Sequence, residues 1–254
     1  MDEKRITVNG VGINFVRHGT GPKILLCLPG SLGTWKTDFG PLLNRFDTKK
    51  YTIVVWDPPG YGKSRPPDMV YHKNYNKDHA PLAAGLMQML SLTPYSILGW
   101  SEGGRTAFHL AHQFPEKVEK LVVWGATNVI DQELGYFFKM IRDPLNWPPE
   151  KLQPFEEIYG MPYVSKTWKA LCDFYIGVSK GDTKLACYEV LSELQPPVQI
   201  IHMGKDNMTS EKIIRDMVKT VPNASMVAHP MGRHNVHLQF PDWFMKTIEK
   251  FLNS

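Results

Sequence analysis

The stretch Gly99-Trp100-Ser101-Glu102-Gly103-Gly104 decides the fold of this chain. It follows the short apolar run 96–98 and leads into a helical pattern over residues 101–114, which ends before Pro115. This is the pattern G-x-S-x-G on a strand-to-helix turn, where flanking glycines let the strained turn pack closely and leave the serine hydroxyl accessible. The position predicts that Ser101 is a nucleophile. The alternative is a tight structural turn that contains a buried serine.

Short apolar runs and helical patterns alternate along the rest of the chain. The runs cover residues 24–28, 52–56, 96–98, 121–124 and 198–201, and further helical patterns cover 81–92 and 242–252. Asn9-Gly10, between residues 6–8 and 13–16, is a hairpin signal. Short runs that are apolar on both faces are typical of strands buried in a parallel sheet. The sequence therefore predicts an α/β fold, a mostly parallel sheet with helices on both faces and a ligand site at the carboxyl ends of the strands.

One segment interrupts this alternation. Residues 131–195 contain no clear strand but carry helical patterns and many prolines and aromatic residues. A long insert between two strands of a sheet usually becomes a cap over the site. We therefore predict a core formed by residues 1–130 and 196–254, with a helical cap at 131–195. Such a cap can also hold a small hydrophobic core of its own.

Composition and charge argue against two classes of partner. The 254 residues include 29 Lys and Arg against 25 Asp and Glu, and the basic residues are scattered rather than gathered in the stripe that nucleic-acid binding requires. No apolar stretch approaches the roughly 18 residues of a membrane span. The N-terminus resembles neither a signal nor a transit peptide, and removal of an earlier leader stays open. Three cysteines without metal-ligand spacing, Cys27, Cys172 and Cys187, favour buried thiols in a reducing compartment. We expect an intracellular monomer.

A nucleophilic serine needs a base, and the base needs an acid that orients it. His234 lies in a glycine-containing loop after the strand-like residues 226–228 and before the last helical pattern, with His237 as its nearest rival. Asp206 follows the strand-like run 198–203, and Asp131 is the alternative acid. The order Ser101, Asp206, His234 is typical of one class of serine hydrolases. The pair His234 and His237 has no convincing third ligand, so we expect no metal and no other cofactor.

The oxyanion of an acyl-transfer intermediate needs two backbone N–H groups directed at one point. We expect one from Glu102, directly after the nucleophile, and one from Ser31, in the turn after the strand-like run 24–28. Gly30 gives the backbone room at this point and is expected to line the substrate site. The turn-forming stretch 57–64 is interpreted as structural.

Five motifs resemble the α/β-hydrolase superfamily when they are taken together: Leu28–Gly33, Trp56–Ser64, Gly99–Gly104, Gly204–Asp206 and Gly232–Leu238. Within it, the chain resembles the valacyclovir hydrolase (biphenyl hydrolase-like) family over nearly its whole length. Trp35–Pro41, Ser64–Asp68 and Val123–Ala126 support this narrower match. The resemblance implies a serine esterase that acts on α-amino acid esters through Ser101, Asp206 and His234. It also implies mitochondrial residence after removal of a leader, so both the cytoplasm and the mitochondrion are expected compartments.

Glu102 departs from the family pattern, which has Asp directly after the nucleophile and uses that carboxylate to bind the substrate's ammonium group. Glutamate keeps the charge and adds one methylene of reach. An anion beside a developing oxyanion is unfavourable unless a positive group neutralises it, and a substrate ammonium would do so. Such a charged hydrogen bond contributes about 1.5–3 kcal/mol. The alternative is that Glu102 only complements the positive N-terminus of the helix that it begins.

Two other functions remain open. A carbon–carbon bond hydrolase of the same fold would use the same three residues, but its substrates are anionic and Glu102 argues against them. A non-catalytic receptor would hold a small ligand under the cap without turnover. Aspartyl-nucleophile dehalogenases and epoxide hydrolases are disfavoured because Ser101 occupies the nucleophile position. The expected partner is a small ester with a free α-amino group.

Overall fold

The computed structural model describes residues 2–254, and an eight-stranded sheet lies at its centre. The strand order is β1-β2-β4-β3-β5-β6-β7-β8. The strands are β1 Asp2–Val8, β2 Val11–His18, β3 Lys23–Leu28, β4 Tyr51–Trp56, β5 Tyr95–Trp100, β6 Val118–Trp124, β7 Val198–Met203 and β8 Ala224–His229. Strands β3 to β8 run parallel, and the β1–β2 hairpin joins one edge in the antiparallel direction. The predicted α/β architecture with a mostly parallel sheet is confirmed.

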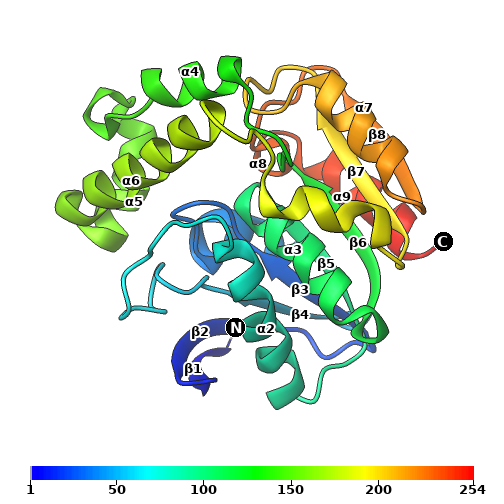
Figure 1. Cartoon of the computed structure of the whole chain (residues 1–254). Helices are drawn as coiled ribbons and strands as arrows, with labels where there is room; N and C mark the ends of the chain where they lie inside the picture. Colours follow the sequence, from blue (N-terminus) through cyan, green and yellow to red (C-terminus); the bar gives the residue numbers. More distant parts are fainter. Residues whose placement is uncertain (1) are drawn as a thin grey trace.

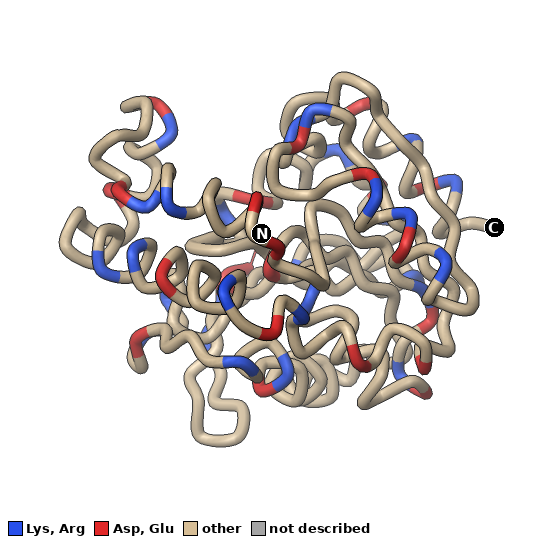
Figure 2. Tube along the Cα trace, turned by 45° about the horizontal axis from the view of Figure 1, so that its top comes forward, with Lys and Arg blue, Asp and Glu red and all other residues tan. Residues whose placement is uncertain are grey.

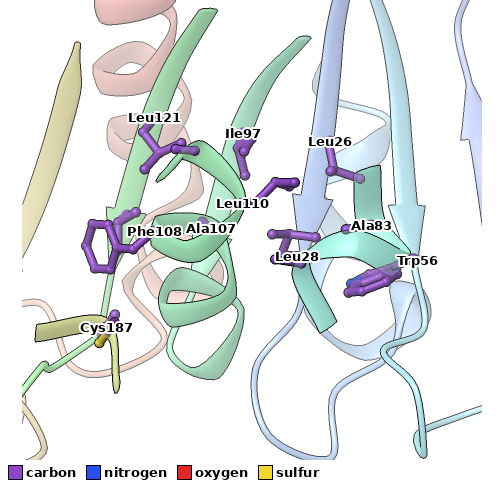
Figure 3. Packing of buried hydrophobic residues seen from close by; sticks show 14 of the residues in the cluster. Leu26, Leu28, Trp56, Ala83, Ile97, Ala107, Phe108, Leu110, Leu121 and Cys187 are labelled. Carbon is purple, nitrogen blue, oxygen red and sulfur yellow. The ribbon is translucent and has the colours of Figure 1, made fainter. Parts of the chain in front are cut away.

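Helices cover both faces of the sheet because successive strand residues point to opposite sides. Leu26 and Leu28 of β3 face one apolar cluster, while Leu25 and Cys27 face the other. The first cluster includes α2 (Tyr75–Met89), α3 (Glu102–Gln113) and α7 (Glu211–Thr220), and the second includes α1 (Gly40–Leu43) and α9 (Pro241–Leu252). Figure 1 shows α2 and α3 side by side in front of the sheet. Figure 3 shows the side chains of α3 packed against the strands behind it.

Two helices differ from the sequence prediction. The pattern over residues 81–92 predicted a helix that starts at Pro81, but α2 runs from Tyr75 to Met89 and contains Pro81 in its interior. Burial of Tyr75 and Asn76 extends the helix before the proline, although an interior proline removes one helical hydrogen bond. The amphipathic helix α7 was not predicted. Ile213, Ile214, Met217 and Val218 recur at helical spacing and pack on the core, so the sequence did carry a signal for this helix, which the prediction missed.

Five helical segments lie between β6 and β7. They are α4 Gln132–Met140, η3 Pro144–Asn146, α5 Pro149–Tyr159, α6 Met161–Ser179 and η4 Ala186–Glu193. Figure 1 shows α4, α5 and α6 beside the sheet layer, whereas η4 packs against α3 on the face of the sheet. The one strand-like pairing in this part of the described chain is the isolated bridge between Val129 and Lys184. We call residues 131–195 the cap region, with the bounds that the sequence predicted. Its role as a cap over a site stays a prediction.

Charges and thiols follow the expected distribution. Figure 2 shows Lys and Arg interspersed with Asp and Glu over the whole trace. Cys27, Cys172 and Cys187 are buried free thiols. Between residues 2 and 254, no helix is both long enough and apolar enough to cross a membrane. The residues that the sequence predicted for the site follow β3, β5, β7 and β8 in the chain.

Candidate active site

Ser101 occupies a strained position between β5 and α3. Its φ of 53° and ψ of −115° lie in a region that side-chain-bearing residues rarely adopt, at a cost of about 1–3 kcal/mol. The Ser101 amide donates to the Trp124 carbonyl at 2.8 Å. A Cβ on Gly103 would lie 2.1 Å from the Leu28 carbonyl oxygen, so the absence of a side chain lets α3 pack directly on the end of β3. This local packing holds the turn in its strained form.

The structure brings Ser101, Asp206 and His234 together. His234 Nε2 lies 3.0 Å from Ser101 Oγ, and His234 Nδ1 lies 2.9 Å from Asp206 Oδ2. The three side chains follow β5, β7 and β8 in the chain, and parallel strands place their carboxyl ends at one edge of the sheet. An ionised Asp206 can only accept, so it places the imidazole proton on Nδ1 and leaves Nε2 to accept from the serine.

Asp206 is held in its ionised form. Burial by itself raises the pKa of this carboxyl, but its interactions with His234, Thr209 and the Met208 amide together hold the pKa below its usual value. Thr209 Oγ1 donates to Oδ2 at 2.7 Å, and the Met208 amide donates to Oδ1 at 2.8 Å. These fixed donors orient the carboxylate toward the imidazole.

The rival residues have other contacts. Asp131 is the N-cap of α4 and accepts from the Leu134 amide at 2.9 Å. His237 is completely buried and accepts at Nδ1 from the Trp124 indole N–H at 3.0 Å. Burial lowers the pKa of His237 to about 3, so this imidazole stays neutral. Neither residue contacts Ser101 by hydrogen bond.

The predicted oxyanion donors belong to two segments that meet near Ser101, since Ser31 Oγ donates to the Glu102 carboxylate. Glu102 is the first residue of α3, so its N–H has no acceptor within the helix. Ser31 lies in a turn that is closed by a hydrogen bond of 3.0 Å from the Gly33 amide to the Gly30 carbonyl. A Cβ on Gly30 would lie 3.3 Å from the Ser101 Cβ, so Gly30 keeps this approach open. The Gly30 N–H itself is engaged, because it donates to Asp38 Oδ2 at 2.9 Å.

The Glu102 carboxylate is buried and turns away from its own helix. Its Oε2 accepts from Ser31 Oγ at 2.7 Å, and the Tyr61 hydroxyl lies 3.2 Å from Oε2 and 3.4 Å from Oε1. Tyr71 lies 2.6 Å from the Tyr61 hydroxyl and completes a chain of hydroxyl groups that ends on the carboxylate. Burial raises the pKa of Glu102, while the Ser31 hydrogen bond opposes this shift. A carboxylate has about four acceptor positions, so Oε1 keeps capacity for a further donor.

Sequence reasoning missed several residues of this site. Tyr61 belongs to the stretch 57–64, whose turn is held by Asp57 as expected of a structural segment, yet its hydroxyl reaches Glu102. Asp38 is a buried carboxyl that accepts from the Gly30 amide and from Thr37 Oγ1. Burial raises the pKa of Asp38 to about 7. Asp38 lies among the polar residues Thr34, Lys36 and Thr37, so its burial leaves no signal in the sequence, and the tyrosine contacts leave none either.

Comparison with known proteins places this geometry in a family. The family model described as alpha/beta hydrolase fold matches residues 23–160. Serine hydrolase BPHL of Mus musculus and that of Homo sapiens are each 36% identical to the chain over 248 residues, which cover 98% of this chain and 85% of each relative. A serine hydrolase from Cycloclasticus zankles has a TM-score of 0.81 at 16% identity and covers 99% of this chain and 98% of its own.

The fold, the strained serine and the full-length relatives agree with one another. The family model covers more than half of the chain, and the BPHL relatives extend the match to the segments that carry Asp206 and His234. The chain therefore belongs to the α/β-hydrolase fold family and is a serine hydrolase.

Proposed function

We propose that this serine hydrolase cleaves esters of α-amino acids, with Ser101, His234 and Asp206 as its catalytic triad. Ser101 attacks the ester carbonyl while His234 takes its proton, and Asp206 stabilises the imidazolium that forms. The N–H groups of Ser31 and Glu102 bind the oxyanion of the tetrahedral intermediate. His234 then protonates the leaving alcohol and activates a water molecule, which hydrolyses the acyl-enzyme and releases the amino acid.

The buried Glu102 carboxylate is the observation that supports α-amino esters as the substrates. It follows the nucleophile directly, is only 3% exposed, and receives neutral donors from Ser31 and Tyr61. A buried negative charge beside a developing oxyanion disfavours turnover unless a cation offsets it. Arg105 offsets part of this charge electrostatically but makes no ion pair with Glu102 in the described chain, so a cation in direct contact with the carboxylate would still favour turnover. The ammonium of an α-amino ester lies one carbon from the carbonyl that Ser101 attacks, so it is placed to supply that cation. The contacts to Ser31 and Tyr61 favour this role over simple complementation of the helix N-terminus.

A matched ester panel tests the proposal. We expect the wild-type protein to cleave an α-amino ester at least tenfold more efficiently, as kcat/KM, than its N-acetyl analogue, because a charged hydrogen bond is worth about 1.5–3 kcal/mol. Glu102→Gln should lose this preference while it still cleaves a plain acyl ester. Ser101→Ala should lose all turnover and keep the fold. Equal efficiencies toward the free and acetylated esters in the wild type would contradict the ammonium role.

Arg105 favours a second candidate, a hydrolase of carbon–carbon bonds in anionic ring-cleavage products. This buried guanidinium lies one helical turn after Glu102 and donates only to neutral groups, namely the Thr127 carbonyl and the hydroxyls of Tyr75 and Tyr175. Glu102 interacts with Arg105 electrostatically, but no hydrogen bond between the two is found among the described residues, so a substrate carboxylate would be the first charged group to bind the guanidinium directly. A dicarboxylate ring-cleavage product therefore belongs in the same panel. Its turnover in place of the amino ester would favour this second function.

A further inference from the structure

The turn that carries Ser31 has an unfavourable backbone conformation. Leu32, at the third position of the turn Gly30–Gly33, has a φ of 57°, which lies in the left-handed region that disfavours residues with side chains. Such a conformation persists only where surrounding contacts determine it. Leu32 is fully buried, and Asp38 holds the first residue of the turn through the Gly30 amide. The Leu32 end of the turn needs a second holding contact.

Tyr159 supplies that contact from the cap region. It is the last residue of α5, and its hydroxyl donates to the Leu32 carbonyl at 2.9 Å. The same hydroxyl accepts from the Gly62 amide at 2.8 Å. One side chain of the cap region therefore fastens the turn that carries Ser31 to the neighbouring loop of the core.

We propose that Tyr159 is a positioning residue that makes the oxyanion hole depend on the docked cap region. Ser31 and Leu32 are the two central residues of the same turn. Fixing the Leu32 carbonyl therefore restrains the direction of the Ser31 N–H. When the cap region is docked, the Tyr159 hydroxyl holds the donor toward the position above Ser101. Without this contact the turn relaxes toward a less strained conformation, and the donor moves away from the oxyanion. This inference rests on the proposed function, because it assigns Ser31 as an oxyanion donor.

Tyr163 offers a matched comparison within the same region. It lies four residues later, in α6, and its ring stacks on that of Tyr159 with a centroid distance of 5.3 Å. Its hydroxyl also fastens the cap region to the core, since it donates to the Gly60 carbonyl and accepts from the Met69 amide at 3.2 Å. Neither partner belongs to the turn Gly30–Gly33. Removal of this hydroxyl weakens docking of the cap region to a similar degree but leaves the Leu32 carbonyl held.

The test compares Tyr159→Phe with Tyr163→Phe on an ester that the wild type hydrolyses. We expect Tyr159→Phe to lower kcat at least tenfold, with KM within about threefold, because loss of an oxyanion donor costs about 10²–10³ in rate and misdirection costs part of this. Its affinity for a boronic acid, which forms a tetrahedral adduct with the serine, should fall in parallel with kcat. Tyr163→Phe should keep kcat and boronate affinity within about threefold of the wild type, although its melting temperature falls similarly.

Two results would overturn the inference. The first is that Tyr159→Phe keeps the kcat of the wild type. The second is an equal loss of kcat in both variants, which would indicate that Tyr159 only attaches the cap region to the core and does not position Ser31. Labelling of Ser101 by a fluorophosphonate separates these results from a failure of the proposed function. If the wild-type serine is labelled and the Tyr159 variant still keeps full kcat, only the inference fails. If the wild-type serine is neither labelled nor active, the inference and the proposed function fail together.

Discussion

At the scale of single residues, the buried carboxyl of Asp38 should determine part of the pH dependence of stability. Its pKa is raised from 3.8 to about 7 by burial, so the folded protein resists ionisation over a range in which the unfolded chain ionises freely. The free energy of unfolding therefore falls as the pH rises through this range and levels off above about 7. A shift of this size corresponds to about 4 kcal/mol at 1.36 kcal/mol for each pKa unit.

Asp38→Asn tests this effect, because asparagine has nearly the same shape and does not titrate. The difference in unfolding free energy between wild type and variant should change by up to about 4 kcal/mol between pH 4 and pH 7, with the wild type losing stability relative to the variant. Urea unfolding at a series of pH values measures it. Glu133→Gln, which removes an exposed carboxylate in α4, is the control and should follow the wild-type curve. Parallel curves for Asp38→Asn and wild type would contradict the prediction.

The site residues that the sequence could indicate share a simple property. Ser101, Asp206 and His234 each follow a strand-like run, and parallel strands bring such positions to one edge, so their proximity was predictable although their catalytic roles stay predictions. Tyr61 and Tyr159 had no such signal. A tyrosine hydroxyl lies far from its own Cα, and which backbone group it reaches depends on packing between segments distant in the chain.

At the scale of elements, the contact between α3 and β3 should tolerate no side chain at Gly103. An added Cβ would meet backbone atoms of Leu28 and Pro29 at 2.1–2.5 Å, and backbone cannot rotate away as a flexible side chain can. Gly103→Ala should destabilise the protein by about 2–3 kcal/mol or more, as overpacked sites do. It should also lower kcat, because α3 carries the Ser101 turn and the Glu102 amide. Denaturant unfolding and ester turnover measure the two effects.

Gly177 in α6 is the matched helical control. It is exposed, and a Cβ there would meet no atom within 4 Å. Alanine has the higher helix propensity, so Gly177→Ala should stabilise the protein by about 0.5–1 kcal/mol and leave kcat unchanged. If Gly103→Ala changed the free energy of unfolding no more than Gly177→Ala does, the contact between α3 and β3 would relax more readily than its distances indicate.

The positions of the strands could be predicted from the sequence better than the boundaries of the helices. The runs 24–28, 52–56 and 198–201 each lie within an observed strand, because a strand that is buried on both faces consists of consecutive apolar residues. The start of helix α2 was predicted wrongly, because Pro81, the expected first residue, lies in the interior of the helix. Local propensity places a boundary at proline, whereas burial of Tyr75 through tertiary packing moves the boundary six residues earlier.

At the scale of the whole molecule, the cap region and the core share one hydrophobic cluster. Phe138, Leu171 and Tyr175 of the cap region belong to the same cluster as Leu26 and Leu110 of the core. The sequence could not reveal this continuity, because an amphipathic helix shows the same pattern whether it packs on a separate small core or on a shared one. The division into residues 1–130 with 196–254 and residues 131–195 thus remains a prediction about function rather than about independent folding.

A shared cluster should make unfolding a single cooperative transition, because the cap region cannot lose its packing without exposing the apolar surface of α3. Leu171→Ala in α6 and Leu110→Ala in α3 are matched tests, since the two leucines are 1% and 0% exposed. Each should lower the free energy of unfolding by about 2–5 kcal/mol and shift one common transition in calorimetry. Hydrogen exchange of α6 peptides should then respond to both variants. If Leu171→Ala instead produced a separate early transition confined to α4–α6, the cap region would be an independently folding unit, and its docking through Tyr159 and Tyr163 would be a reversible step available for substrate entry.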